Sequence, residues 1–72
     1  MERRNVINLS EYYQHKGRMM KVTDIDGILW TGFGTIGTDY ETNKNFVDIK
    51  DPSQNYITEI FEDEIKSIEV LE

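Results

Sequence analysis

The first apolar residues of the chain recur with the spacing of one helical face. They stand three and four positions apart and are Leu9, Tyr12 and Tyr13. Asn8 precedes them as a cap residue, and Glu11 stands at the third helical position, which is the arrangement of a capping box. Gly17 readily adopts the left-handed conformation that ends helices. The pattern predicts a helix over about residues 8–16, which is too short to be stable alone and must dock on the rest of the chain.

From residue 18 onward the apolar period changes to two, which is typical of β-strands. Polar or turn-forming segments separate the alternating runs: Asp-Gly, TDYETNKN, DPSQN and EDE. The predicted strands are 18–25, 28–36, 44–50, 55–61 and, after a short turn, the end of 63–71. Five short strands after one helix predict a single, mostly β domain over residues 1–72, with a strongly bent and partly closed antiparallel barrel.

The first predicted hairpin turns at Asp26 and Gly27. A two-residue type I′ turn at this point pairs Ile25 with Ile28. That register gives each face of the hairpin its own apolar set. The two sets are Met20, Val22, Leu29 and Phe33, and Thr23, Ile25, Ile28 and Trp30. We expect the first set inside the barrel, and the helix or a partner over part of the second. Ile25, Ile28 and Trp30 are therefore the candidate protein-contact surface.

Two acids and a glycine in the same turn resemble part of a calcium-binding loop. The run Asp24-x-Asp26-Gly27 lacks the third acid before the glycine and the glutamate beyond it that such a loop requires. We interpret the aspartates as turn residues and predict no metal site.

Three glycines have the spacing of a dinucleotide-binding motif. They are Gly32, Gly34 and Gly37. That motif works between a parallel strand and a helix whose N-terminus faces the pyrophosphate. Here the glycines lie within a predicted strand that leads to a polar loop and another strand. We interpret them as positions where the sheet bends, and we predict no cofactor.

The chain offers few groups for catalysis. It has no cysteine and a single histidine, His15, which the helical pattern places toward solvent without a second ligand or an acid at matching spacing. The serines are explained as cap, turn or strand residues, because no base is apparent beside them. We therefore predict that the protein is not an enzyme.

The composition also bears on the compartment. Without cysteine there are no disulfides, which fits a reducing environment. No apolar run approaches the ~20 residues of a membrane helix, and the first residues contain no apolar region of a signal peptide. We expect a cytoplasmic protein with no membrane partner.

The net charge of −6 is unevenly distributed. Residues 1–21 carry five basic and two acidic residues, whereas residues 22–72 carry three basic and twelve acidic residues. Nucleic-acid binding depends strongly on basic groups that neutralise phosphates. The acidic body therefore disfavours a nucleic-acid partner, and only the N-terminal segment attracts phosphate. The acidic run Glu62, Asp63 and Glu64 is either a solvated turn or a patch for a basic partner.

The order of these features resembles the Sm-like (LSm) family of SH3-like small barrels. The likeness covers residues 9–71 and is carried by the helix, the Asp-Gly turn, Gly32, and the spacing of Asp39 and Asn43. It implies a helix on a five-stranded SH3-like barrel, rings assembled through strands four and five, and single-stranded RNA bound by a loop after strand two. With Tyr40 between them, Asp39 and Asn43 form the candidate RNA loop.

The chain departs from the family pattern at three places. Asp39 lies one residue too far from Gly32. Thr42 stands where the family has methionine in that loop. The Arg-Gly element between strands four and five is missing, and Phe61, Glu62 and Asp63 occupy its region. Acids at this place repel the phosphates that the family binds there.

Three functions fit the sequence. The first is a small Sm-like interaction module without enzymatic activity, which acts through protein–protein contacts or self-association in a homo-oligomer. The second is binding of single-stranded RNA in the Sm manner. The third is an acidic inhibitor that mimics nucleic acid and blocks a basic protein.

Overall fold

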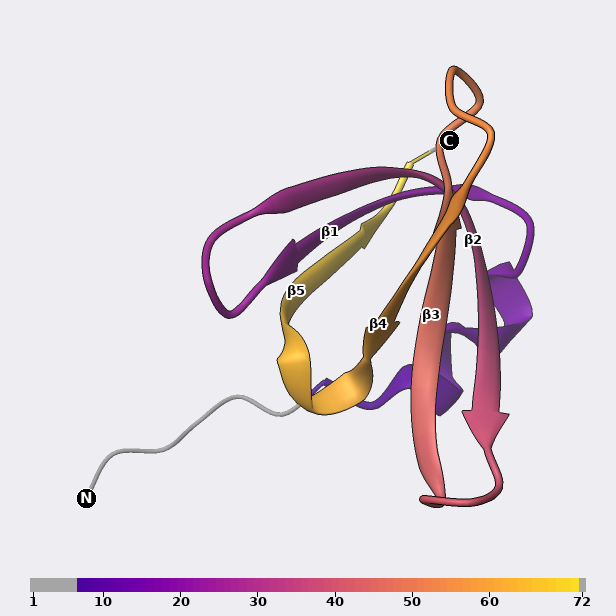
Figure 1. The fold of residues 1–72 in the computed structure, drawn as a ribbon, viewed down its shortest axis with the longest axis vertical. Coiled ribbons are helices and arrows are strands. Elements are labelled where there is room, and N and C mark those ends of the chain that lie inside the picture. The colour runs from indigo at the N-terminus through magenta and orange to yellow at the C-terminus, as the bar shows by residue number, and fades with distance from the viewer. Residues whose placement is uncertain (1–6, 72) are drawn as a thin grey trace.

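The structure is a computed structural model that describes residues 7–71. It contains two short 3₁₀ helices and five strands (Figure 1). In chain order these are η1 (Leu9–His15), β1 (Met19–Asp24), β2 (Leu29–Asp39), β3 (Lys44–Lys50), β4 (Ile57–Phe61), η2 (Glu62–Glu64) and β5 (Ile65–Val70). The predicted strands are confirmed, and their ends shift by at most a few residues. Of the predicted basic segment over residues 1–21, residues 1–6, with Arg3 and Arg4, lie outside the described residues.

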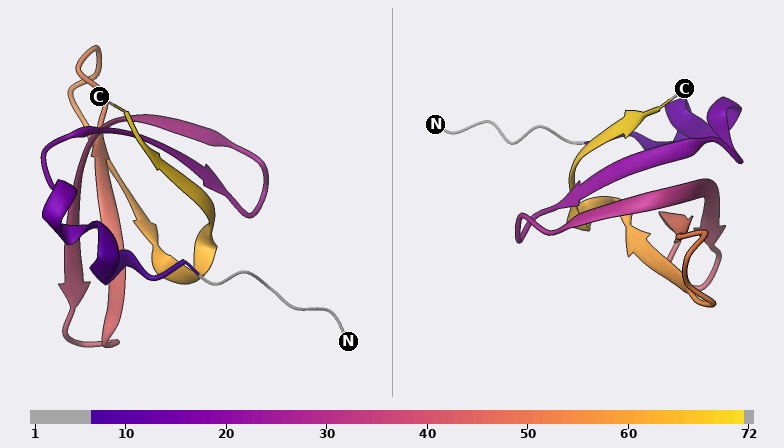
Figure 2. Two further views of the ribbon diagram at one scale, coloured as in Figure 1. Left: turned by 180° about the vertical axis from the view of Figure 1, so that it is seen from behind. Right: turned by 90° about the horizontal axis from the view of Figure 1, so that it is seen from above.

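All five strands form one antiparallel sheet in the order β4-β3-β2-β1-β5. The long central strand β2 pairs with β1 through its first half and with β3 through its second half, and Phe33 has a partner on both. The sheet bends strongly but is not closed, as Figure 2 shows. The coarser prediction, mostly β with one N-terminal helix and five antiparallel strands, is confirmed, whereas the predicted partly closed barrel is not, because β4 and β5 do not pair. Strands β4 and β5 are the two free edges.

Helix η1 forms where the capping pattern predicts a helix, but as a 3₁₀ helix. The Asn8 side chain accepts hydrogen bonds from the backbone N–H and the hydroxyl of Ser10, at 3.2 and 2.7 Å. Gly17 follows the helix in the left-handed conformation at φ +83°, as predicted. Its N–H donates to the carbonyl oxygen of Gly34 at 2.7 Å, which joins the end of the helix to β2. Of the predicted apolar face, Leu9 is fully buried, whereas Tyr13 is half exposed.

The predicted register of the first hairpin is wrong by one residue. Met20 pairs with Gly32 and Val22 pairs with Trp30. The loop has three residues instead of two, because the N–H of Asp24 donates to the Ile28 carbonyl oxygen at 3.0 Å. Gly27, at φ +83°, takes the left-handed position that three-residue hairpin loops require.

A slip of one residue moves every side chain of one strand to the other face of the sheet. Met20 and Val22 are fully buried, as expected, but Trp30 lies on their side and packs against the core. Leu29 and Phe33, which the predicted register placed inside, are 58% and 44% exposed. The outward apolar set of the hairpin is therefore different from the predicted one.

The core lies on the concave face of the bent sheet, and η1 packs against the same face of β2 and β3. Its buried side chains come from η1 and from four strands. They are Leu9, Met20, Val22, Val47, Ile49, Ile60 and Ile65. Figure 2 shows the helix lying across β2 and β3, at a distance from the tip of the β1–β2 hairpin. One side of the core is thus covered by the helix.

The glycines of β2 are needed for close packing in addition to any bend. A Cβ atom on Gly32 would overlap the carbonyl group of Lys50 at the end of β3. A Cβ atom on Gly34 would overlap the sulfur of Met20, which is fully buried. The two positions let β3 and the β1 side chain approach β2.

Candidate functional site

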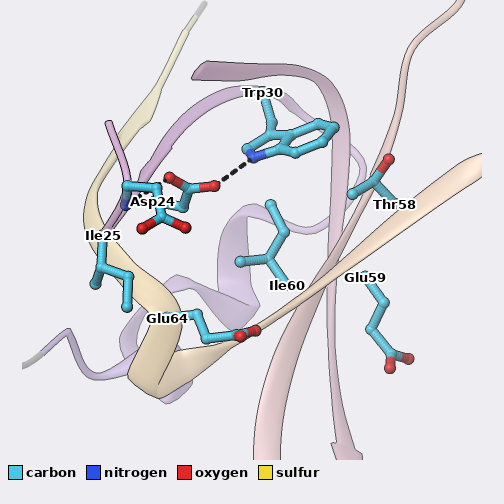
Figure 3. Close-up of a pocket in the computed structure, with 8 residues that line it drawn as sticks. Asp24, Ile25, Trp30, Thr58, Glu59, Ile60 and Glu64 are labelled. Atoms are coloured by element: carbon cyan, nitrogen blue, oxygen red, sulfur yellow. Dashed lines mark hydrogen bonds between the residues drawn. The ribbon is translucent and has the colours of Figure 1, made fainter. Parts of the chain in front are cut away.

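The side of the core that the helix does not cover contains a cavity, drawn in Figure 3. We call it the seam cavity because it lies between the β1–β2 hairpin and the free edge strand β4, with η2 at its base. Its volume is about 160 Å³. The lining residues are Asp24, Ile25, Asp26, Trp30, Thr58, Glu59, Ile60 and Glu64. They come from two segments that are distant in sequence, 24–30 and 58–64, and that meet through the sheet topology.

Asp24 organises the hairpin side of the seam cavity. One carboxylate oxygen accepts hydrogen bonds from the backbone N–H groups of Asp26 and Ile28, both at 2.9 Å. The other accepts from the indole Nε1 of Trp30 at 3.1 Å. These bonds close the three-residue loop and hold the indole as a wall of the cavity (Figure 3).

The same hydrogen bonds change the ionisation of Asp24. The N–H groups stabilise the carboxylate form, and the pKa of Asp24 lies below its usual value, with the Ile28 N–H as the largest cause and the Trp30 indole as the second. Asp24 therefore stays negatively charged at neutral pH.

The seam cavity combines apolar walls with negative charge. Ile25, Trp30 and Ile60 supply the apolar surface, and four of the eight lining residues are acidic. Figure 3 shows the side chain of Glu64 across the base of the cavity, while that of Glu59 turns away from it. Among residues 7–71, no lysine or arginine lines the cavity.

The two ion pairs found between described residues lie elsewhere. Lys21 pairs with Glu69 at 3.9 Å, and Lys44 pairs with Asp63 at 3.3 Å. Neither of these lysines lines the seam cavity, so they do not compensate its charge.

The structure separates the predicted contact surface into two parts. Ile25 and Trp30 both line the seam cavity, where they lie near Ile60. Ile28 is half exposed at the hairpin tip and does not line it. The pattern of residues 55–61 predicts a strand that contains Ile60. The sequence alone does not indicate that Ile60 meets the hairpin.

The predicted acidic patch has three residues with three different environments. Glu62 accepts a hydrogen bond from the backbone N–H of Leu9 at 2.7 Å, which links η2 to the start of η1. Asp63 forms the ion pair with Lys44, and Glu64 lines the seam cavity. Of these three residues, only Glu64 lines the cavity and adds to its charge.

The candidate RNA loop joins β2 to β3. Asp39 accepts a hydrogen bond from the backbone N–H of Glu41 at 3.0 Å, and Asn43 adopts φ +57°. Both residues thus have a role in forming the turn. Tyr40 is 90% exposed.

Tyr40 also borders a second, wider hollow, which sequence reasoning missed. This groove lies between η1 and the far ends of β2 and β3 and has a volume of about 530 Å³. Its lining residues are Ser10, Tyr13, Ile36, Gly37, Thr38, Tyr40 and Asn45. The Thr38 hydroxyl donates to the Asn45 side-chain oxygen at 2.7 Å across the two strands. The periodicity of the helix could have indicated Tyr13, but the pairing of the groove walls depends on how the helix docks.

Two further features of residues 7–71 concern metal binding and membrane spanning. No group of three or more histidine, cysteine, aspartate or glutamate side chains is arranged to hold a metal ion there. In the same range, no helix has the length and apolar character needed to cross a membrane.

Comparison with models of protein families, with curated proteins and with solved structures found no match. The functional interpretation therefore rests on the geometry of the seam cavity, the two edge strands and the groove.

Proposed function

We propose that this chain is an Sm-like interaction module without enzymatic activity, and that its copies associate edge to edge, β4 of one copy against β5 of the next. The observation that carries the proposal is the strand order β4-β3-β2-β1-β5, which leaves both strands as free edges. The chain also has the helix and the five strands that the Sm-like resemblance implies. In the rings of that family, the contacts between copies are made by strands four and five.

The two edges are suited to pairing with each other. Strand β4 has five residues and β5 has six, so an antiparallel pair matches along nearly its whole length. An unpaired edge presents free N–H and C=O groups, which readily template a further strand. Both edges also place apolar side chains on the concave face, Ile60 on β4 and Ile68 on β5.

The symmetry of this contact determines the type of assembly. Because β4 meets β5 and not another β4, each new copy leaves one edge of each kind free. Such a heterologous contact closes as a ring where its rotation allows closure and otherwise continues as an open filament. We therefore expect more than two copies in the assembly.

The proposal is tested by measuring mass in solution with light scattering. We expect a mass above twice the 8.5 kDa of one chain. Ile57→Lys replaces an exposed apolar side chain of the edge strand β4 by a charge, which opposes strand pairing at that edge, so it should shift the mass toward that of the single chain. Leu29→Lys is the matched control, because both side chains are 58% exposed but Leu29 lies on the central strand β2. Loss of assembly in both variants alike would contradict edge pairing.

A second candidate function, binding of single-stranded RNA, is favoured by the groove between Tyr13 and Tyr40. Both rings are at least half exposed, and they border a hollow large enough for a nucleobase. Stacking on an aromatic side chain contributes ~1–3 kcal/mol per base. The acidic body opposes this binding, so it requires low salt to be detected.

This candidate is tested by filter binding with poly-U and poly-A at low salt. Binding that Tyr40→Ala removes and that Tyr56→Ala keeps would support it, because Tyr56 is exposed but lies outside the groove. No binding at micromolar protein would exclude it.

A further inference from the structure

The size of the seam cavity limits what it can hold. A cavity of ~150 Å³ accepts one benzene-sized group, and this one measures about 160 Å³. Pockets for cofactors and drug-sized ligands are usually ~300–1,000 Å³. The seam cavity therefore suits a single side chain better than a free small molecule.

The walls of the cavity indicate the chemistry of that side chain. Ile25, Ile60 and the Trp30 indole match the methylene stem of a lysine, which buries its stem while its charged end stays near water or an acid. The indole face attracts cations, and Asp24 and Glu64 supply negative charge on opposite sides in Figure 3. An aliphatic side chain that ends in a cation complements both the walls and the charge.

Strand β5 carries one lysine in an unusual position. Thr23 pairs with Ser67 and Asp24 pairs with Ile65, so the register skips Lys66. This irregularity is a β-bulge, a feature that redirects a side chain and interrupts regular pairing. Lys66 is exposed and forms no ion pair with the described residues, whereas Lys21 and Lys44 are already paired.

We propose that Lys66 of a neighbouring copy enters the seam cavity, with its stem against Trp30 and Ile60 and its ammonium group between the carboxylates of Asp24 and Glu64. The inference rests on the proposed edge pairing, which brings β5 of one copy alongside β4, the strand that forms one wall of the cavity. It gives a reason why copies with a charge of −6 associate despite their repulsion. One cation of each copy meets the acidic seam cavity of the next.

A charge exchange tests this contact. The variants are Lys66→Glu, Glu64→Lys and the double variant, which restores both the net charge and the opposite pair. Glu41→Lys is the control, because it changes the net charge as Glu64→Lys does but lies in the loop between β2 and β3. Lys66→Met, which keeps an apolar stem and removes the charge, separates packing from electrostatics.

Two quantities are measured for each variant. The first is the concentration of half-assembly from light scattering. The second is the fluorescence emission of Trp30, the only tryptophan of the chain, which should move to shorter wavelength when a stem covers the indole. We expect each single charge reversal to raise the half-assembly concentration at least about tenfold, since close charge pairs at interfaces couple strongly. The double variant should return to within about threefold of the wild type, as in a double-mutant cycle.

The outcomes separate this inference from the proposed function. A chain that stays monomeric at every concentration contradicts both. A chain that assembles, with single reversals no more harmful than Glu41→Lys or a double variant without recovery, contradicts the lysine contact and leaves edge pairing intact. Assembly without any change in Trp30 emission also contradicts it.

Discussion

The core of this protein is covered on two sides in different ways. On one side η1 packs across β2 and β3, and Leu9 is fully buried there. On the other side the β1–β2 hairpin and β4 enclose the seam cavity, where the half-buried Trp30 faces acidic side chains. The helix side is closed by apolar packing, whereas the seam side keeps charge and an unfilled volume. The comparison indicates that the helix side supplies stability and that the seam side is available for a partner.

The largest expected effect is on the helix side. Leu9→Ala removes a fully buried side chain from the core, and such changes usually cost about 2–5 kcal/mol of unfolding free energy. A loss of this size would unfold much of a domain this small. Urea unfolding followed by circular dichroism measures it. A cost below about 1 kcal/mol would show that the helix does not close the core.

The second largest expected effect on stability is at the close approach of β2 and β3, two strands that belong to both sides of the core. Gly32→Ala places a methyl group against the backbone of Lys50, and overpacking of this kind costs about 1–3 kcal/mol. Gly27→Ala is a useful contrast, because nothing lies near its added methyl group and only the left-handed φ opposes it. Thermal unfolding of the two variants measures both costs. If Gly32→Ala unfolds at the wild-type temperature, the strands are not as close as the structure has them.

On the seam side, a pH dependence should reveal the Asp24 network. Because the pKa of Asp24 is lower in the folded chain than in the unfolded chain, its bonds contribute stability that is fully present above the unfolded value of ~3.9. That contribution is lost as the pH falls through the lower, folded pKa. In Asp24→Asn the unfolding free energy should therefore depend less steeply on pH in this acid range.

Urea unfolding at a series of pH values from 5 to about 2 measures this slope. Asp26→Asn is the matched control, because it removes one carboxylate from the same hairpin loop. Equal slopes for Asp24→Asn and the wild type would show that Asp24 does not hold the hairpin.

The smallest expected effects lie on the exposed side chains of the hairpin. Ile25→Ala and Leu29→Ala remove residues that are 52% and 58% exposed, so each should change the unfolding free energy by less than about 0.5 kcal/mol. The predicted register placed Leu29 in the core, where the same change would cost as much as Leu9→Ala. Comparing Leu9→Ala with Leu29→Ala by urea unfolding therefore tests the register directly.

The strand pattern of this chain could be predicted from the sequence because alternation and turn residues agree. The residues between strands, such as Asp26-Gly27 and the segment around Pro52, interrupt the period of two at the right places. The capping pattern of Asn8 likewise predicted the position of the helix. These are local signals, and local structure follows them.

The hairpin register could not be predicted from the same signals. Gly27 suits the two-residue turn and the three-residue loop equally, because both require a left-handed residue there. Both faces of the hairpin are apolar, so periodicity did not decide which one was buried. The side chain of Asp24 favours the wider loop by accepting two backbone N–H groups and the Trp30 indole.

The candidate site was predicted in part. Ile25 and Trp30 were expected at a contact surface, and the structure places both in the seam cavity. The expected acidic patch contributes only Glu64. Ile60 could not be assigned to the site, because its approach to the hairpin depends on the bend of the sheet and on the turn η2, which are not local properties of the sequence.

The central claim is that β4 and β5 join copies of this chain, and light scattering over a range of concentrations tests it most directly. The account predicts a mass that rises above twice 8.5 kDa and falls toward 8.5 kDa in Ile57→Lys but not in Leu29→Lys. A mass of 8.5 kDa for the wild-type chain at every concentration up to its solubility limit would contradict it.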